Sequence, residues 1–247
     1  MQCAFSSAHL CCVGRRKSAE DSGCYSTFRF IERVMRTLHE CRLYGIIDLG
    51  YIEESETTRV AEEMIQGGVD LIQLRGKGKS LHELTGHAAR LHELTQKSAT
   101  PLIVNDYGEI AGQVMVEGVH VGQDDDSIEL ARRKANRAIV VGKSTHSLEQ
   151  ALAAQRDGAD YIGFGPIFAT PTKPDYAPIG LSDVGRVHAE VNLPIFCIGG
   201  INIDNLQSVI DAGAKRVVMV SALLKAQRIV DYARCATDML ASRRIFK

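Results

Sequence analysis

The sequence predicts an α/β fold, a single (β/α)8 TIM barrel that follows a non-barrel N-terminal extension. From residue 42 onward, short apolar β-rich runs alternate with amphipathic stretches of helical spacing. The runs are continuously apolar, which is typical of parallel strands buried on both faces. Eight such runs fall within about 180 residues, which favours a closed barrel over an open sheet.

The expected elements alternate along the chain. The strands are LYGIID from Leu43, VDLIQL from Val69, PLIVN from Pro101, GVHVG from Gly118, AIVVG from Ala138, DYIGFG from Asp160, PIFCIG from Pro194 and RVVMV from Arg216. The clearest helices are expected at residues 57–66, 81–97, 148–156 and 203–211.

Glycine occupies four of the helix-to-strand junctions, as Gly67-Gly68, Gly118, Gly158 and Gly213. Helices often end at a glycine because it adopts the left-handed backbone conformation without strain. We therefore expect each of these glycines to stop a helix just before the next strand.

Composition excludes several classes of protein. The chain has 247 residues, of which 45% are apolar, and this suits one barrel-sized domain with a sizeable core. A net charge of −1 gives no general attraction to nucleic acid or to an anionic membrane. No apolar run approaches the roughly 20 residues that a membrane-spanning helix needs. Small-molecule partners are therefore expected, and a homo-oligomer is left open.

Cysteine usage points to a reducing compartment. The chain has seven cysteines and no CxxC pair, so a zinc ribbon is not expected. An odd count without a recognisable secretory signal fits reduced thiols, and we expect a cytoplasmic location.

Residues 1–40 lack the later alternation and are expected to form a poorly ordered extension, with the barrel domain at 41–247. The basic cluster at residues 15–17 follows an apolar stretch instead of preceding it, which disfavours a signal peptide. The spacing of Phe28, Ile31, Val34 and Leu38 fits a short amphipathic helix. A translation start at Met35 is a second interpretation of this segment.

The most informative segment is YIGFGPIFATPTKPD, at residues 161–175. Its strand ends at Gly163 and Gly165, and the loop that follows carries Thr170, Thr172 and Lys173. Glycine allows a backbone to approach a ligand closely, and hydroxyl and ammonium groups donate to phosphate oxygens. The segment therefore predicts a loop that grips phosphate, in an enzyme acting on phosphorylated small molecules.

Barrel enzymes place their active sites at the carboxyl ends of the strands, and polar residues collect at those ends here. In chain order they are Gln73, Arg75, Lys77, Asn105, Asp106, Gln123, Asp124, Asp125, Ser144, Thr145, His146, Thr170, Thr172, Lys173 and Ser221.

Two anion sites and one cation site are predicted from these residues. Gly199-Gly200 and Val220-Ser221 end the last two strands, where barrels commonly bind phosphate. Arg75 and Lys77 suit a more highly charged anion such as pyrophosphate. Asp106 and Asp125 suit Mg²⁺, which typically takes one or two carboxylates together with substrate phosphates.

Ordinary structural roles are the alternatives. Asn105-Asp106 and Asp124–Asp126 are good helix caps. His120 is expected to pack within its strand or to support a site residue, and not to be catalytic. The histidines at 82, 87 and 92 are expected on the surface. His146 lies among the candidate site residues and its role stays open.

Together these motifs resemble the thiamine phosphate synthase family. The resemblance runs from about residue 42 to residue 240, and the strand 6 motif is its most specific part. It rests on QLRGK (73–77), ND (105–106), GVHVGQDD (118–125), STH (144–146), GFGPIFATPTK (163–173) and IGGI (198–201).

The resemblance implies a transferase that joins hydroxymethylpyrimidine pyrophosphate to a thiazole phosphate, carboxylated or not, with Mg²⁺ and with release of pyrophosphate. It implies a dissociative substitution, in which the C–O bond breaks early and the thiazole nitrogen captures the pyrimidine-methyl cation. Gln73, Arg75, Lys77 and Asn105 would hold the pyrimidine pyrophosphate. Asp106 and Asp125 would bind Mg²⁺, and Arg75, Ser144 and Lys173 would act on the departing pyrophosphate. Thr170, Thr172, Gly200, Val220 and Ser221 would hold the thiazole phosphate.

One position departs from the family, and two other functions stay open. Many members carry an acidic residue where this chain has Gly76, which is expected to loosen the loop. A thiazole tautomerase shares the barrel and uses a histidine at the position of His146. A non-catalytic barrel that binds a thiamine precursor is the other alternative.

Overall fold

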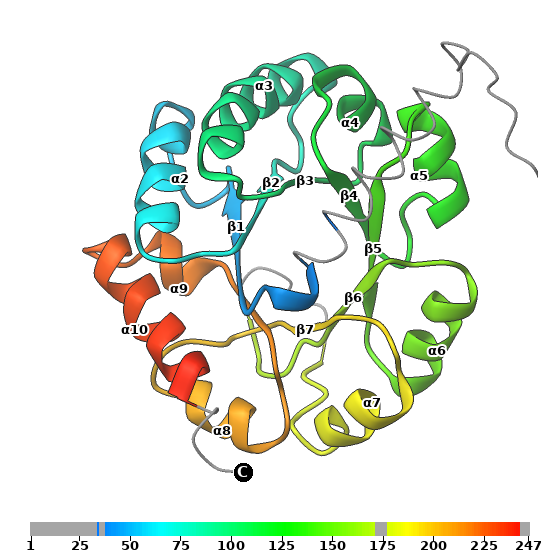
Figure 1. Ribbon diagram of the computed structural model, residues 1–247, viewed down its shortest axis with the longest axis vertical. Coiled ribbons are helices and arrows are strands. Elements are labelled where there is room, and N and C mark those ends of the chain that lie inside the picture. The colour runs from blue at the N-terminus through cyan, green and yellow to red at the C-terminus, as the bar shows by residue number, and fades with distance from the viewer. Residues whose placement is uncertain (1–33, 35–37, 171–176, 243–247) are drawn as a thin grey trace, which may run out of the picture.

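The computed structural model describes residues 34, 38–170 and 177–242, which form a closed barrel (Figure 1). Eight parallel strands pair in chain order, and the last pairs with the first. They are β1 (Leu43–Asp48), β2 (Leu71–Arg75), β3 (Leu102–Asn105), β4 (Gly118–Val121), β5 (Val140–Thr145), β6 (Tyr161–Phe164), β7 (Ile195–Cys197) and β8 (Val217–Met219). Each strand overlaps its predicted run, so the predicted barrel is confirmed.

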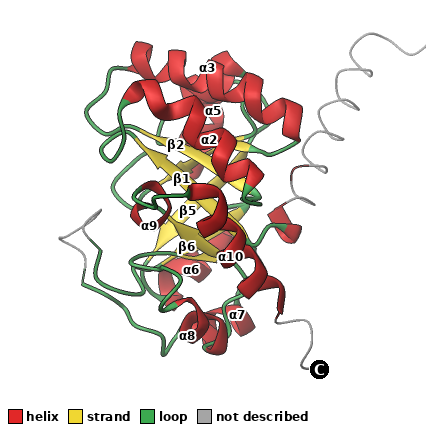
Figure 2. Cartoon of the chain, turned by 90° about the vertical axis from the view of Figure 1, so that its left-hand side faces the viewer, coloured by secondary structure: helices red, strands yellow, loops and turns green. Residues whose placement is uncertain are grey.

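Helices cover the outside of the strand ring (Figures 1 and 2). They are η1 (Glu54–Glu56), α2 (Thr57–Gln66), α3 (Leu81–Ser98), α4 (Gly108–Val114), α5 (Ile128–Ala135), α6 (Leu148–Arg156), α7 (Val184–Glu190), α8 (Leu206–Asp211), α9 (Ser221–Leu224) and α10 (Ile229–Ser242). The helix expected from residue 203 begins later, because Asn202 Oδ1 accepts hydrogen bonds from the amides of Asp204 and Asn205 and holds a turn there.

The glycine junctions are confirmed at three of the four places. Gly68, Gly158 and Gly213 have φ of 90°, 84° and 112° and follow the ends of their helices. The prediction for Gly118 is wrong, because Gly118 lies inside β4 and Met115 takes the left-handed conformation after α4 with φ 69°. A Cβ on Gly118 would lie 2.3 Å from the carbonyl oxygen of Val140, so this glycine allows two strands to approach.

Two apolar layers hold the barrel together. One lies between the strands and the outer helices, and the other fills the barrel interior. In the interior, the rings of Tyr44, Tyr161 and Phe196 meet edge to face, with centroids 5.4 to 6.2 Å apart. Such pairs favour one fixed arrangement of the rings, so the floor beneath the carboxyl ends of the strands is well defined.

The described residues before β1 also pack into the interior. Residues 38–40 are helical, and Val34 and Leu38 are 2% and 0% exposed. Both belong to the interior cluster that contains Tyr44 and Phe196. They therefore close the amino-terminal end of the barrel. The domain division at residue 40 stays a prediction.

We expect Leu38→Ala to destabilise the fold by about 2–5 kcal/mol, because it leaves a cavity in the barrel interior. Chemical denaturation of the two proteins measures the difference. Deletion of residues 1–33, which keeps Val34 and Leu38, is the control and is expected to leave turnover unchanged, since no predicted site residue lies there. Equal stability of Leu38→Ala and wild type would contradict the proposed closing role.

Among the described residues, no helix combines the length and the apolarity that crossing a membrane requires.

Candidate active site

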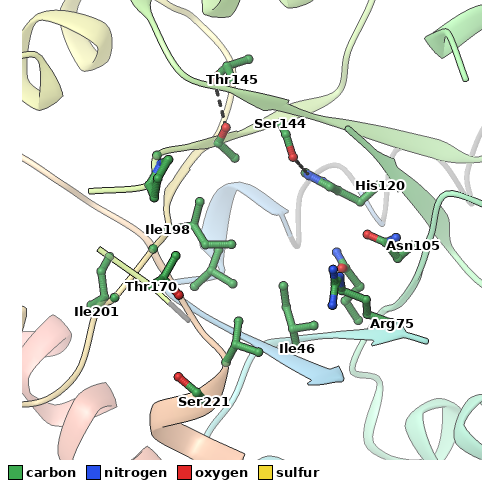
Figure 3. Close-up of a pocket in the computed structure, with 18 of the residues that line it drawn as sticks. Ile46, Arg75, Asn105, His120, Ser144, Thr145, Thr170, Ile198, Ile201 and Ser221 are labelled. Carbon is green, nitrogen blue, oxygen red and sulfur yellow. Dashed lines mark hydrogen bonds between the residues drawn. The ribbon is translucent and has the colours of Figure 1, made fainter. Parts of the chain in front are cut away.

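A cavity opens at the carboxyl ends of the strands and gathers most of the predicted site residues (Figure 3). It has about 830 Å³ of empty space, solvent at its mouth included. The predicted residues that line it are Gln73, Arg75, Asn105, Ser144, Thr170, Gly200, Val220 and Ser221. Strand ends far apart in the sequence therefore meet around one space.

Three predicted residues form a charged cluster outside the cavity lining. Lys77 Nζ lies 2.5 Å from Asp106 Oδ2 and 3.6 Å from Asp125 Oδ1. One ammonium group thus contacts both carboxylates that were predicted as metal ligands. The two aspartates follow adjacent strands, β3 and β4, and the structure brings them together as the sequence predicted.

Asp106 has an unusual backbone conformation. Its φ is 66°, in the left-handed region, and its amide donates to the carbonyl of His120 at 2.9 Å. Such residues cost free energy and gather at functional sites. Helix α4 begins at Gly108 with no side-chain cap, so the cap interpretation of Asn105-Asp106 is wrong.

Asp125 is held by a different contact. Its Oδ2 accepts the amide of Gly122 at 2.9 Å, which turns the carboxylate back toward the end of β4. Ser127 caps α5, with Oγ accepting from Leu130 N at 3.1 Å. The cap interpretation of Asp124–Asp126 is therefore also wrong.

The two carboxylates ionise differently. Burial, and then the neighbouring Asp125, raise the pKa of Asp106 against the opposing effect of Lys77. Burial also disfavours ionisation of Asp125, but hydrogen bonds from Asp106 and the Gly122 amide, with the charge of Lys77, lower its pKa overall. The pair therefore carries mutual repulsion that a bound cation would relieve.

This cluster fits a divalent cation. Its carboxylate oxygens are the ligand type that Mg²⁺ prefers, and a cationic ammonium already lies against both. In the described part of the chain, no cluster of three histidines, cysteines or acidic residues suits a metal. The chain would thus supply two carboxylates, and substrate phosphates would supply further oxygens.

Arg75 is oriented by a residue that the sequence analysis missed. Its guanidinium forms an ion pair with Asp48, which is 2% exposed and lies opposite it in the β1–β2 ladder. Asp48 Oδ1 also accepts the amide of Gly50 at 2.9 Å. The signal was available, because Asp48 ends the first expected strand just as the other polar residues end theirs.

The phosphate end of the cavity depends on two glycines. Gly199 and Gly200 have φ of 102° and 64°, and Cβ atoms there would lie 2.4 Å from Pro166 and 2.6 Å from the carbonyl of Ala169. Asn205 Nδ2 donates to the carbonyl of Gly200 at 2.9 Å and holds the turn. Val220 and Ser221 stand at the start of α9, where backbone N–H groups without intrahelical partners are available to an anion.

The expectation that Gly76 loosens its loop is wrong. A Cβ on Gly76 would lie 2.6 Å from Leu84 Cδ2 and 3.0 Å from Leu49 Cδ1, so the backbone is packed beneath both side chains. Lys79 N donates to the Gly76 carbonyl at 3.3 Å and closes a turn. Because glycine has no Cβ, it leaves room for the side chain of Leu84, which is 2% exposed.

The surface prediction holds for His82 but is wrong for His87 and His92, which are 4% and 7% exposed. His87 Nε2 contacts Glu54 at 2.9 Å, and His92 Nε2 contacts Gln96 at 2.9 Å. Both lie on the face of α3 that packs against the rest of the protein, and this is why they are buried.

Two histidines line the cavity itself. His146 Nδ1 contacts the carbonyl of Gly165, and His120 Nε2 lies 3.0 Å from Ser144 Oγ (Figure 3). His120 was expected to pack or to support a site residue, and its contact with Ser144 agrees with the second interpretation. Thr172 and Lys173 lie outside the described residues, whereas Thr170 is described.

Comparison with known proteins agrees with this geometry. The family model described as thiamine monophosphate synthase matches residues 43–223. The thiamine-phosphate synthase of Chloroflexus aurantiacus is 44% identical over 194 residues, which cover 78% of this chain and 89% of that protein. The enzyme of the same name from Halalkalibacterium halodurans is 38% identical over 209 residues, covering 84% of this chain and 99% of that protein.

A solved structure is similar as well. Thiamine phosphate pyrophosphorylase from Pyrococcus furiosus superposes with a TM-score of 0.75 at 30% identity, covering 85% of this chain and 98% of that one. The family match and the relatives each span most of the chain. Enzymes of this family use a metal. The chain therefore belongs to the thiamine monophosphate synthase family and is a transferase of thiamine biosynthesis.

Proposed function

We propose that this barrel joins hydroxymethylpyrimidine pyrophosphate to a thiazole phosphate, forming thiamine phosphate and pyrophosphate, with Mg²⁺ as its metal. The observation that supports the proposal is that two groups of residues suited to bind anions lie on one rim. One combines Arg75, Lys77 and two carboxylates, and the other is the glycine turn beside α9. Two separately phosphorylated substrates need two such sites.

The pyrimidine pyrophosphate is assigned to the first site. Gln73 and Asn105 line the cavity and would bind the ring through their side-chain amides, while Arg75 and the nearby Lys77 would bring positive charge to the diphosphate. Asp106 and Asp125 would hold Mg²⁺, which when bound neutralises charge on phosphate oxygens. Lys77 must then leave the carboxylates, which frees its ammonium for the diphosphate.

The thiazole phosphate is assigned to the second site. Gly200, Val220 and Ser221 would present backbone N–H groups, and the Thr170 and Thr172 hydroxyls would complete the phosphate contacts. In this assignment the thiazole ring would lie between the phosphate turn and the pyrimidine site.

The reaction needs stabilisation of a leaving group more than it needs a base. As the C–O bond breaks, negative charge grows on the pyrophosphate, and Arg75, Ser144 and Lys173 are proposed to donate to it. The substitution is proposed to be dissociative, and the neutral thiazole nitrogen captures the pyrimidine-methyl cation left when the C–O bond breaks, so no proton must be removed from it first.

The two alternative functions use less of this site. A thiazole tautomerase would employ His146 but has no use for the cluster of Lys77, Asp106 and Asp125. A non-catalytic binder would have no reason to hold Arg75 rigidly through Asp48. The relatives reported above carry the synthase name.

Measurement of pyrophosphate release tests the proposal. Both substrates with saturating Mg²⁺ are expected to release pyrophosphate, omission of either substrate should abolish release, and EDTA should suppress it. Conversion of the thiazole phosphate alone, with no release in the complete mixture, would favour the tautomerase. Binding without conversion of either substrate would favour the non-catalytic barrel.

Mg²⁺ affinity should fall as the pH falls. Metal binding requires ionised carboxylates, and Asp106, whose pKa is raised by burial and by Asp125, takes up its proton at a higher pH than an ordinary aspartate. Half-saturating Mg²⁺ is therefore expected to rise as the pH falls, beginning above the usual aspartate range. Steady-state titrations at each pH measure it. A half-saturating concentration independent of pH would contradict the assignment.

We propose a cytoplasmic location because the cysteines of the described residues are free thiols. Cys41, Cys197 and Cys235 are free among the described residues. Burial raises the pKa of the Cys41 and Cys197 thiols to about 12, so both stay protonated and pack as apolar groups.

The proposed partners are the two small-molecule substrates, with no nucleic acid.

A further inference from the structure

We propose that a buried chain of hydrogen bonds, running from Gln73 through Tyr44, Tyr161 and His120 to Ser144, sets the direction in which the Ser144 hydroxyl points its hydrogen. His120 and Tyr161 are then positioning residues, which act on the leaving group through Ser144. This inference rests on the proposed function, because the role of Ser144 is part of that function.

The chain of contacts is continuous. Gln73 Nε2 lies 2.6 Å from Tyr44 Oη, and Tyr44 Oη lies 3.2 Å from Tyr161 Oη. Tyr161 Oη lies 3.2 Å from His120 Nδ1, and His120 Nε2 lies 3.0 Å from Ser144 Oγ, as the dashed line in Figure 3 shows. Five side chains from strands β1, β2, β4, β5 and β6 thus form one path across the barrel interior.

The path begins in a buried, tightly packed region and ends at the cavity. Tyr44 and Tyr161 are 1% and 0% exposed, and Gln73 is 2% exposed. Tyr161 pairs with Gly142 in the β5–β6 ladder, and a Cβ on Gly142 would lie 2.1 Å from the Tyr161 ring. The glycine therefore makes room for this ring. Buried hydroxyls are costly to leave unbonded, so the path is expected to satisfy every hydrogen it can.

The amide of Gln73 gives the path its direction. Its nitrogen can only donate, so Tyr44 Oη accepts from Gln73 and must pass its own hydrogen to Tyr161. Tyr161 Oη, having accepted from Tyr44, donates to His120 Nδ1. Burial raises the pKa of both tyrosines, so both keep the hydrogens that this requires.

The consequence falls on Ser144. A neutral histidine that accepts at Nδ1 carries its hydrogen on Nε2 and donates it to Ser144 Oγ. The hydroxyl of Ser144 has then accepted from the protein, and its hydrogen is directed into the cavity. The opposite direction would make Ser144 donate to His120 and would present only an oxygen lone pair to an anion. Only the first direction helps a departing pyrophosphate.

Nitrogen-15 NMR of the histidine side chains tests the direction without reference to activity. The signal of His120 is assigned by its loss in His120→Gln. In the wild-type protein we expect His120 to carry its hydrogen on Nε2 and to have an unprotonated Nδ1 that accepts a hydrogen bond. Tyr161→Phe, which removes the donor to Nδ1, should shift His120 toward a mixture of tautomers. Hydrogen on Nδ1 in the wild-type protein would overturn the proposal.

Kinetics test whether the path acts through Ser144. Tyr161→Phe is expected to lower kcat about 10-fold, the scale of one hydrogen bond, with KM for both substrates little changed. When Tyr161→Phe is added to the Ser144→Ala variant, kcat should fall no further. The Ser144 hydroxyl that Tyr161 is proposed to position is already absent from that variant. Equal losses from Tyr161→Phe in both backgrounds would show a merely structural role and would contradict the proposal.

Tyr44→Phe is the matched control within the same aromatic cluster. It removes the same atom one step further from Ser144 and leaves Tyr161 able to donate to His120, so its effect on kcat should be smaller. Thermal denaturation of each variant separates loss of stability from loss of function. If Ser144→Ala itself turns over normally, the proposed leaving-group role fails, while the NMR result still decides the direction of the path.

Discussion

Replacement of Asp106 by alanine is expected to lower turnover at least about 100-fold, because a bound metal supplies several kcal/mol of charge stabilisation. The carboxylate contacts Lys77 and adjoins Asp125, so its loss leaves one carboxylate to hold Mg²⁺. Turnover measured across a Mg²⁺ titration should show both a lower maximum and a higher half-saturating concentration.

The choice of variant matters at this position. Alanine at a φ of 66° adds about 1 kcal/mol of backbone strain, whereas asparagine tolerates this conformation well. Asp106→Asn should therefore lose turnover nearly as severely while keeping the stability of the wild-type protein. Asp124→Ala removes an exposed carboxylate from the β4–α5 loop and should leave turnover within a few-fold. Near-normal activity of Asp106→Asn would remove Asp106 from the metal site.

The second large effect is expected at Arg75. Arg75→Gln should lower kcat/KM for the pyrimidine pyrophosphate on the order of 100-fold or more, because hydrogen bonds to charged groups each contribute about 1.5–3 kcal/mol. Arg75→Lys should recover only part of this loss, since an ammonium lacks the planar fork of the guanidinium. Initial rates over a range of pyrimidine pyrophosphate measure both variants.

Asp48→Asn tests whether the orientation of the Arg75 guanidinium matters in addition to its charge. It keeps the guanidinium but removes the buried anion that pairs with it, so it should cost less activity than Arg75→Gln. Arg59→Gln is the control, because Arg59 pairs with Glu56 and Glu63 on the exposed face of α2. Activity of Arg75→Gln equal to that of Arg59→Gln would exclude Arg75 from diphosphate binding.

The sequence predicted the barrel well because its elements are local. Apolar runs and helical spacing report how each segment buries its own side chains, and the fold rule for parallel barrels then places every strand end on one rim. Asp106 and Asp125 could be assigned to one site on this basis alone, although 19 positions separate them in the sequence. Wrong predictions arose where a neighbour outside the local pattern decided the outcome, as at Gly76, where the fit beneath Leu84 and Leu49 is tertiary.

By itself, the sequence determined which residue types reach the rim, because period and strand order are properties of the chain. Only the tertiary structure decided which of them touch: that Asp48 holds Arg75, that Lys77 joins two carboxylates, and that His120 meets Ser144. The physical reason is that a hydrogen bond or ion pair depends on distances of a few tenths of an ångström. Packing across the barrel sets those distances, and no single segment contains them.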